Sequence, residues 1–137
     1  MPASPEVLQV ATGQLKTHLA LGAWGEALVA HRFAKLGFTI LERNWRGGGG
    51  ELDLVCSREE LIVFVEVRTR SSRFLDSPTM TVNGQKQLKV SKAASAWLMA
   101  HETDYDSIRF DVVGVVADDE GAGIEHIENA FVPQWAY

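Results

Sequence analysis

Two apolar segments separated by a tight turn each carry an acidic residue inside a strand pattern. Residues 51–57 and 61–69 alternate and are rich in Val, Leu and Phe, which predicts the two strands of a hairpin. A turn of two or four residues between them places Asp53 directly opposite Glu66. Like charges that face each other destabilise a sheet, and a partly buried carboxylate needs a partner. The hairpin therefore predicts a compensating divalent cation such as Mg²⁺, which prefers oxygen ligands.

The same residues resemble the PD-(D/E)XK nuclease motif, with Asp53 as its Asp and Glu66 and Arg68 as the first and last residues of its E-x-K. More narrowly, the chain resembles the bacterial UPF0102 (YraN-like) family, which is similar in fold to archaeal Holliday-junction resolvases. One departure matters, because the usual lysine of the motif is Arg68 here. The segments that carry the resemblance are G-A-W-G-E-A at 22–27, L-E-R-N-W-R at 41–46, G-E-L-D-L at 50–54, F-V-E-V-R-T-R at 64–70 and R-F-D-V-V at 109–113.

Length and composition are typical of one cytoplasmic domain. We expect residues 1–14 to form a flexible tail and residues 15–137 to form a single domain. No apolar run reaches membrane-spanning length, and residues 1–13 lack the basic and apolar parts of a secretory signal. Cys56 is the only cysteine, which excludes an intrachain disulfide and favours a reducing compartment. We therefore expect a cytoplasmic location, no membrane partner, and a packing role for Cys56.

The net charge of −5 argues against a general nucleic-acid coat protein, but the charge is unevenly distributed. Residues 1–100 hold 12 Lys and Arg against 9 Asp and Glu, whereas residues 101–137 hold 1 against 9. A basic front half is compatible with a local surface that faces phosphates. Two ordinary solvated faces would explain the same distribution equally well.

The polarity pattern predicts the element order α-β-β-β-α-β with an optional last strand. This order indicates an α/β fold, and the resemblance implies a restriction-endonuclease-like core, a mixed sheet flanked by helices. In the second helix Leu88, Val90, Ala94, Trp97 and Leu98 are expected to face inward, and Lys86, Lys89 and Lys92 mostly outward. The expected elements are a helix at 15–36 ended by Gly37, a strand at 38–45, a glycine turn at 47–50, the hairpin, a helix after Asn83 to 101, and strands at 108–117 and 124–131.

Three acids are candidate metal ligands for Mg²⁺ or Mn²⁺. Asp53 and Glu66 are the primary pair, and the alternative is a structural network in which Arg68 and Arg70 neutralise them. Glu26 lies in a helical stripe of small and apolar residues, so we expect it on or beside the buried face. The resemblance implies that Glu26 helps bind the metal; a structural pair with a nearby arginine is the alternative.

The resemblance assigns catalysis to Asp53, Glu66 and Arg68. Arg68 can stabilise charge on a phosphate, but it does not deprotonate to act as a base. Arg68 is also expected opposite Glu51, so it can equally serve as a carboxylate clamp. Candidate contacts to nucleic-acid phosphates are Arg43, Arg46, Arg70, Arg73, Lys86 and Lys89, with Lys92 beside them; for each residue alone, an ordinary solvated surface role is the favoured interpretation.

We hypothesise a Mg²⁺- or Mn²⁺-dependent endonuclease, a phosphodiesterase acting on DNA in preference to RNA and on branched DNA in particular. The alternative is a non-catalytic nucleic-acid-binding module with a nuclease-like fold, which the exchange at Arg68 favours. A third hypothesis is a protein-interaction domain, which the acidic C-terminal part favours. Resolvase-like enzymes act as dimers, so the resemblance also implies a homodimer.

Overall fold

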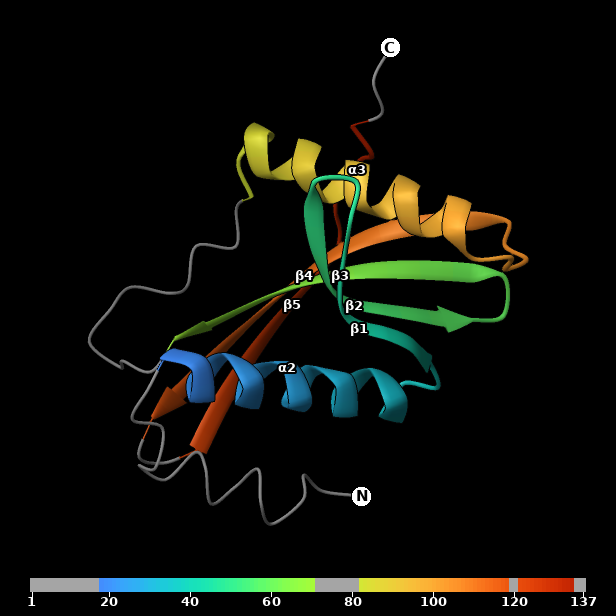
Figure 1. Ribbon diagram of the computed structural model, residues 1–137. Helices are drawn as coiled ribbons and strands as arrows, with labels where there is room; N and C mark the ends of the chain where they lie inside the picture. Colours follow the sequence, from blue (N-terminus) through green and yellow to red (C-terminus); the bar gives the residue numbers. More distant parts are fainter. Residues whose placement is uncertain (1–17, 71–81, 119–120, 135–137) are drawn as a thin grey trace.

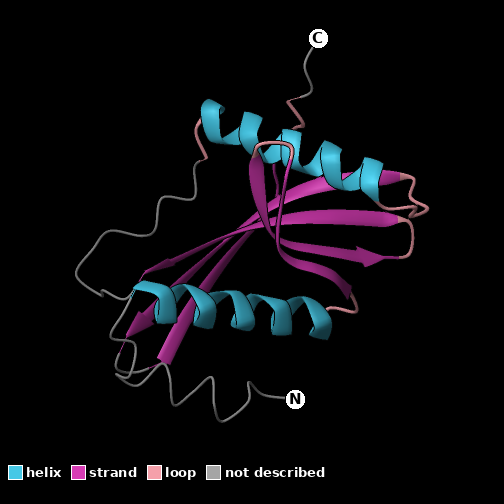
Figure 2. Cartoon of the chain, viewed as in Figure 1, coloured by secondary structure: helices cyan, strands magenta, loops and turns pink. Residues whose placement is uncertain are grey.

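A twisted five-stranded sheet lies between two helices in the computed structural model, which describes residues 18–70, 82–118 and 121–134 (Figure 1). The helices cover opposite faces of the sheet (Figure 2). The predicted tail, the expected helix start at Leu15 and the loop before residue 82 lie mostly or wholly outside the described residues. The elements are α2 (His18–Lys35), β1 (Thr39–Gly47), β2 (Gly50–Arg58), β3 (Leu61–Arg70), α3 (Gly84–Ala100), β4 (Ser107–Asp118) and β5 (Gly121–Phe131).

The sheet is mixed, and its strands follow the order β1-β2-β3-β4-β5. Strands β1, β2 and β3 pair antiparallel, β3 and β4 pair parallel through the α3 crossover, and β5 pairs antiparallel with β4. A parallel pair needs such a crossover, and helices on both faces bury the apolar central strands. The predicted α/β class and element order are confirmed, and the optional last strand is the edge strand β5.

Two apolar clusters form the core, one on each face of the sheet. On one face, α2 packs against β2, β3 and β4; on the other, α3 packs against the opposite sides of the same strands. The prediction that Leu88 faces inward is wrong, because its side chain is 38% exposed. Val90, Ala94 and Trp97 are buried as predicted. No helix in the described part of the chain is long and apolar enough to cross a membrane.

Glycine ends α2 as predicted. Gly37 has a φ of 91°, and its N–H donates to the carbonyl of Ala34 while the N–H of Phe38 donates to Phe33. This pair of bonds satisfies the last carbonyls of a helix whose next residue adopts the left-handed conformation. Arg58 adds a hydrogen bond to the Leu36 carbonyl at 2.7 Å, which ties the β2–β3 turn to the helix end.

The glycine turn between β1 and β2 packs against the backbone of α3. A Cβ at Gly48 would lie 2.6 Å from the Lys92 carbonyl oxygen, and one at Gly50 would lie 2.6 Å from that of Lys89. Gly48 also has a φ of 62°. The glycines therefore serve a tight turn, as predicted, and also a close approach of the hairpin to the helix.

Close contact between α2 and β3 predicts a destabilising effect for Gly25→Ala. A Cβ at Gly25 would overlap Oγ1 of Thr69 and lie 2.9 Å from its Cγ2. We expect the free energy of unfolding to fall by about 1–3 kcal/mol, the usual cost of overpacking. The matched control is Gly22→Ala in the same helix, where a Cβ meets nothing within 4 Å among the described residues. Chemical denaturation should show Gly22→Ala neutral or more stable, since alanine favours a helix; equal effects of the two variants would contradict this account.

Candidate carboxylate site

The pairing of β2 with β3 stops where Asp53 and Glu66 begin. The ladder runs from Arg58 opposite Leu61 to Leu54 opposite Val65, which confirms the predicted register and a two-residue turn. At the next position the Asp53 carboxylate accepts the N–H of Val67 through Oδ2 at 2.8 Å. The Asp53 side chain thus accepts a hydrogen bond from a backbone N–H of β3 that points toward β2. The two acids lie at the point where the strands separate.

Burial raises the pKa values of both acids, and a neighbouring carboxylate adds to the effect on each: Glu66 on Asp53, and Glu51 on Glu66. Burial, then the charge of Glu66, and to a lesser degree that of Glu26, raise the pKa of Asp53 to about 7. Burial also raises the pKa of Glu66, against the lowering effects of Lys86 and Arg68. The hydrogen bond from Val67 lowers the pKa of Asp53 and only partly offsets these effects. Both carboxylates are therefore harder to ionise in the folded protein than in water, chiefly because they are removed from solvent.

Within the described part of the chain, Lys86 is the cation that forms an ion pair with Glu66. Its Nζ lies 3.1 Å from Oε1 of Glu66, and the two side chains are 41% and 9% exposed. The prediction that Lys86 lies mostly outward is confirmed only in part: its side chain is partly exposed, but its ammonium reaches from the first turn of α3 to Glu66 on β3. Residues 83 to 86 form the predicted helix cap, with Oδ1 of Asn83 accepting the Lys86 N–H at 2.8 Å.

Glu26 approaches the pair from the α2 side. It is half-buried and lines a cavity of about 220 Å³ with Val67 and Thr69 of β3. Its charge is one of the causes that raise the pKa of Asp53. Across residues 18–70, 82–118 and 121–134, however, no three His, Cys, Asp or Glu side chains are grouped to hold a metal ion. The structure thus brings Asp53 and Glu66 together and leaves Glu26 at the margin.

Arg68 and Glu51 lie beside the acids without pairing with each other. Glu51 pairs with Arg46 instead, at 3.3 Å between Oε2 and Nη2. Arg68 is half-buried, and its Nε has no hydrogen-bond partner among the described residues. A buried guanidinium N–H without a partner is costly, so this group is available to an incoming acceptor.

The predicted phosphate contacts are spread over the hairpin and α3. Arg46 and Lys89 border a cavity of about 510 Å³ that includes Gly47, Gly49, Gly50 and Glu51. Arg43 and Lys92 are exposed, and Arg70 is half-buried at the end of β3. Arg73 lies outside the described residues. Arg46 and Lys89 flank Glu51 at the glycine turn. Burial, and to a lesser degree the charge of Glu51, raises the pKa of Glu66.

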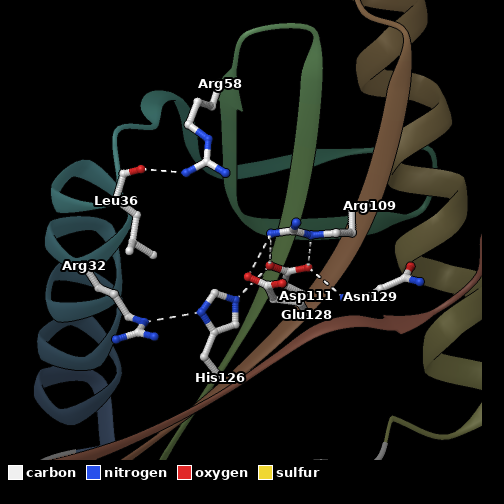
Figure 3. Close-up of polar contacts among 8 residues, drawn as sticks. All are labelled: Arg32, Leu36, Arg58, Arg109, Asp111, His126, Glu128 and Asn129. Carbon is white, nitrogen blue, oxygen red and sulfur yellow. Dashed lines mark hydrogen bonds and ion pairs between the residues drawn. The ribbon is translucent and has the colours of Figure 1, made fainter.

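A second polar cluster, which the sequence analysis did not identify, surrounds Asp111 on β4 (Figure 3). Asp111 is fully buried. Arg109 donates to its two oxygens at 2.8 and 2.9 Å, His126 Nε2 lies 2.8 Å from Oδ2, and the Asn129 N–H donates to Oδ1 at 3.0 Å. An aspartate within the apolar run 108–117 was the available signal, because a buried carboxylate requires partners.

His126 links this cluster to α2. Arg32 Nε donates to His126 Nδ1 at 3.3 Å, so the ring hydrogen is on Nε2 and donates to Asp111 (Figure 3). His126 also packs against Phe33, with 5.0 Å between ring centroids. The network thus joins α2, β4 and β5 on one face of the sheet. Arg109, His126 and the Asn129 N–H all donate to one carboxylate, and Arg32 orients the histidine, which is typical of a structural centre.

The single thiol is inert. Cys56 is fully buried on β2, and burial together with the charge of Asp111 raises its pKa to about 12. The thiol stays protonated at neutral pH, so it is no nucleophile. Its predicted role as a small strand residue is confirmed.

Comparison with known proteins identifies relatives along most of the chain. Residues 25–115 match the model of a family described as "Uncharacterised protein family UPF0102". A UPF0102 protein of Syntrophomonas wolfei is 45% identical over 111 residues, covering 81% of this chain and 96% of the relative. Those of Anaeromyxobacter dehalogenans and Moorella thermoacetica are 46% and 44% identical over 112 residues, covering 82% and 80% of this chain and 84% and 93% of the relatives. The matched segment contains every acid and cation of the carboxylate site.

Proposed function

The chain belongs to the UPF0102 family, and we propose that it is a phosphodiesterase that cleaves DNA with Mg²⁺ or Mn²⁺ at Asp53 and Glu66. The observation that carries this proposal is the pair of carboxylates at the end of the β2–β3 ladder, Glu66 buried and Asp53 half-buried, whose pKa values are raised by burial and by neighbouring carboxylates. Carboxylate oxygens are the ligands that both cations prefer.

The donor set fits such a cation. Asp53 and Glu66 would hold it, and Glu26 would complete the site from α2. A divalent cation supplies Lewis-acid stabilisation of the negative charge on a phosphate. Asp53 is kept oriented by the Val67 N–H, and the half-buried Arg68 would neutralise charge that develops on the phosphate.

The surrounding cations favour a polyanionic substrate. Arg46 and Lys89 flank the cavity at the glycine turn, and the exposed Arg43 extends the same hairpin. Arg70 at the end of β3 is a further proposed contact, as is Arg73, which lies outside the described residues. Such contacts would position a DNA backbone without reading its sequence. We propose branched DNA as the substrate and a homodimer as the active form on the resemblance to resolvases, and a cytoplasmic location on the single reduced thiol.

A nucleic-acid-binding module without turnover is the second candidate. The observation that favours it is Arg68, which occupies the position of the motif's lysine and does not act as a base. Such a module would bind DNA with a steep dependence on salt and would not cut it.

Glu66→Gln distinguishes the two candidates. We expect the wild-type protein to nick forked or junction DNA in a Mn²⁺ series, and Glu66→Gln to lower the rate by about 100-fold or more, because half of the donor pair loses its charge. The control is Glu59→Gln, an exposed residue of the β2–β3 turn far from the site, which should cleave like wild type.

Duplex and single-stranded DNA complete the substrate set. Undiminished cleavage by Glu66→Gln would indicate a contaminating nuclease and remove the support for this site. Salt-dependent binding of all substrates without cleavage by wild type would make the binding module the better proposal.

A further inference from the structure

We propose that Lys86 of α3 is the functional lysine of the carboxylate site, standing in for the lysine that Arg68 replaces on β3. Its ammonium neutralises Glu66 while no cation is bound and then faces the phosphate of the substrate. The second half of this inference rests on the proposed function; the first half does not.

The contact between Lys86 and Glu66 crosses from one layer of the fold to another. Glu66 lies on the same side of β3 as Ile62 and Phe64, whose side chains belong to the cluster under α3. It therefore faces α3, and it is 8% exposed. An ion pair with one nearly buried partner is screened much less than a pair between two exposed side chains. The 3.1 Å contact is thus part of the packing between α3 and β3.

The start of α3 is held in place from several directions. Asn83 accepts the N–H of Lys86 at its side chain and that of Gln87 at its carbonyl, at 2.8 and 2.9 Å. Gln87 Nε2 donates to the carbonyl of Val82 at 2.7 Å, and Val82 is buried in the cluster under α3. One turn further on, the Lys89 backbone meets the glycine turn. These contacts fix where the Lys86 side chain begins, and the pair with Glu66 holds its ammonium at the site.

Lys86 and Arg68 differ in chemistry and in the direction from which they approach this site. An ammonium is a compact charge with three donors, whereas a guanidinium is a planar fork that stays protonated. Arg68 follows Glu66 by two residues and approaches along the strand; Lys86 approaches from the helix above. The chain therefore departs from the nuclease motif in the position of its lysine and not in its chemistry.

Lys86→Met tests, without any activity measurement, whether the Lys86 ammonium neutralises Glu66 while no cation is bound. The Mn²⁺ concentration that gives half of the rise in melting temperature should fall by roughly three- to tenfold, because no ammonium then competes for Glu66. Lys86→Arg retains the charge and should stay closer to wild type. The control is Lys89→Met, an exposed lysine of the same helix, which should leave the midpoint unchanged.

Steady-state nicking of forked DNA tests whether the Lys86 ammonium then faces the phosphate of the substrate. Lys86→Met should lower kcat by about 100-fold with KM changed less than about threefold, the effect of losing a donor used in the transition state. Lys89→Met should instead raise KM and leave kcat unchanged. Arg68→Lys should leave kcat within about threefold of wild type if Lys86 already supplies the ammonium.

Two results would overturn the inference. The first is a Mn²⁺ midpoint that is the same in Lys86→Met and wild type. The second is an active wild type whose kcat is unaffected by Lys86→Met. If wild type cuts no substrate, the proposed function fails, and the Mn²⁺ midpoint alone then decides whether Lys86 is the counter-cation of Glu66.

Discussion

Asp111→Asn is expected to lower the free energy of unfolding by about 3–5 kcal/mol, the usual cost of removing one partner from a buried charged network. The carboxylate is fully buried and accepts hydrogen bonds from Arg109, His126 and the Asn129 backbone. The asparagine amide has the same size but only one acceptor oxygen. Its NH2 group takes the place of the other oxygen and faces N–H groups that are themselves donors. Arg109 and His126 would then lose partners in an apolar layer.

The pKa of Asp111 gives this effect a pH dependence. Burial alone would raise that pKa, but hydrogen bonds from His126 and Arg109 outweigh it and lower the pKa below its usual value of 3.8. A lowered pKa contributes stability above the unfolded-state pKa, and this stability is lost as pH falls through the folded-state pKa. The difference in the free energy of unfolding between Asp111→Asn and wild type should therefore be largest near pH 7 and should decrease below about pH 4.

Urea denaturation at several pH values measures the effect, and Glu128→Gln is the matched control. Glu128 lies 3.8 Å from the same Arg109 guanidinium, but its side chain is 64% exposed. Its removal should cost less than about 0.5 kcal/mol. Equal losses in the two variants would mean that the buried network contributes no more than a surface ion pair.

Asp53→Asn should have the opposite sign and stabilise the metal-free protein at pH 8 by about 2–4 kcal/mol, since one unit of pKa shift is worth about 1.4 kcal/mol. Asn keeps an oxygen that accepts the Val67 N–H, but it removes the charge that burial and Glu66 oppose. The pKa of Asp53 is raised from 3.8 to about 7. Wild type therefore loses stability as pH rises between about 4 and 7, because only the unfolded state ionises freely there.

Thermal unfolding in EDTA and in Mn²⁺ tests this expectation. The gain from Asp53→Asn should be largely absent near pH 3, where the folded and unfolded carboxylates of wild type are both largely protonated. Millimolar Mn²⁺ should raise the melting temperature of wild type and not that of Asp53→Asn, because a ligand that binds only the folded state stabilises it. An Asp53→Asn protein that is less stable than wild type at pH 8 would show that the carboxylate is already compensated.

Local patterns in the sequence were sufficient for the elements and for one pair of site residues. Alternation and a two-residue turn set the β2–β3 register, which places Asp53 beside Glu66. Gly37 and Asn83 marked helix ends because left-handed backbone and N-cap hydrogen bonds need those residue types. Such signals act over a few residues, so they can be interpreted without the fold.

Contacts between layers were decided only by the tertiary structure. The rotation of α3 on the sheet turns Lys86 toward Glu66 and exposes Leu88, although periodicity alone suggested the reverse. The pairing of β5 with β4 brings His126 to Asp111. The position of α2 on β3 determines how closely Glu26 approaches Asp53. Each of these pairs depends on the relative rotation and distance of elements packed across the core. The sequence by itself determined which residues lie in strands and helices and which acids face each other in the hairpin; side-chain packing determined which cations and which histidine meet them.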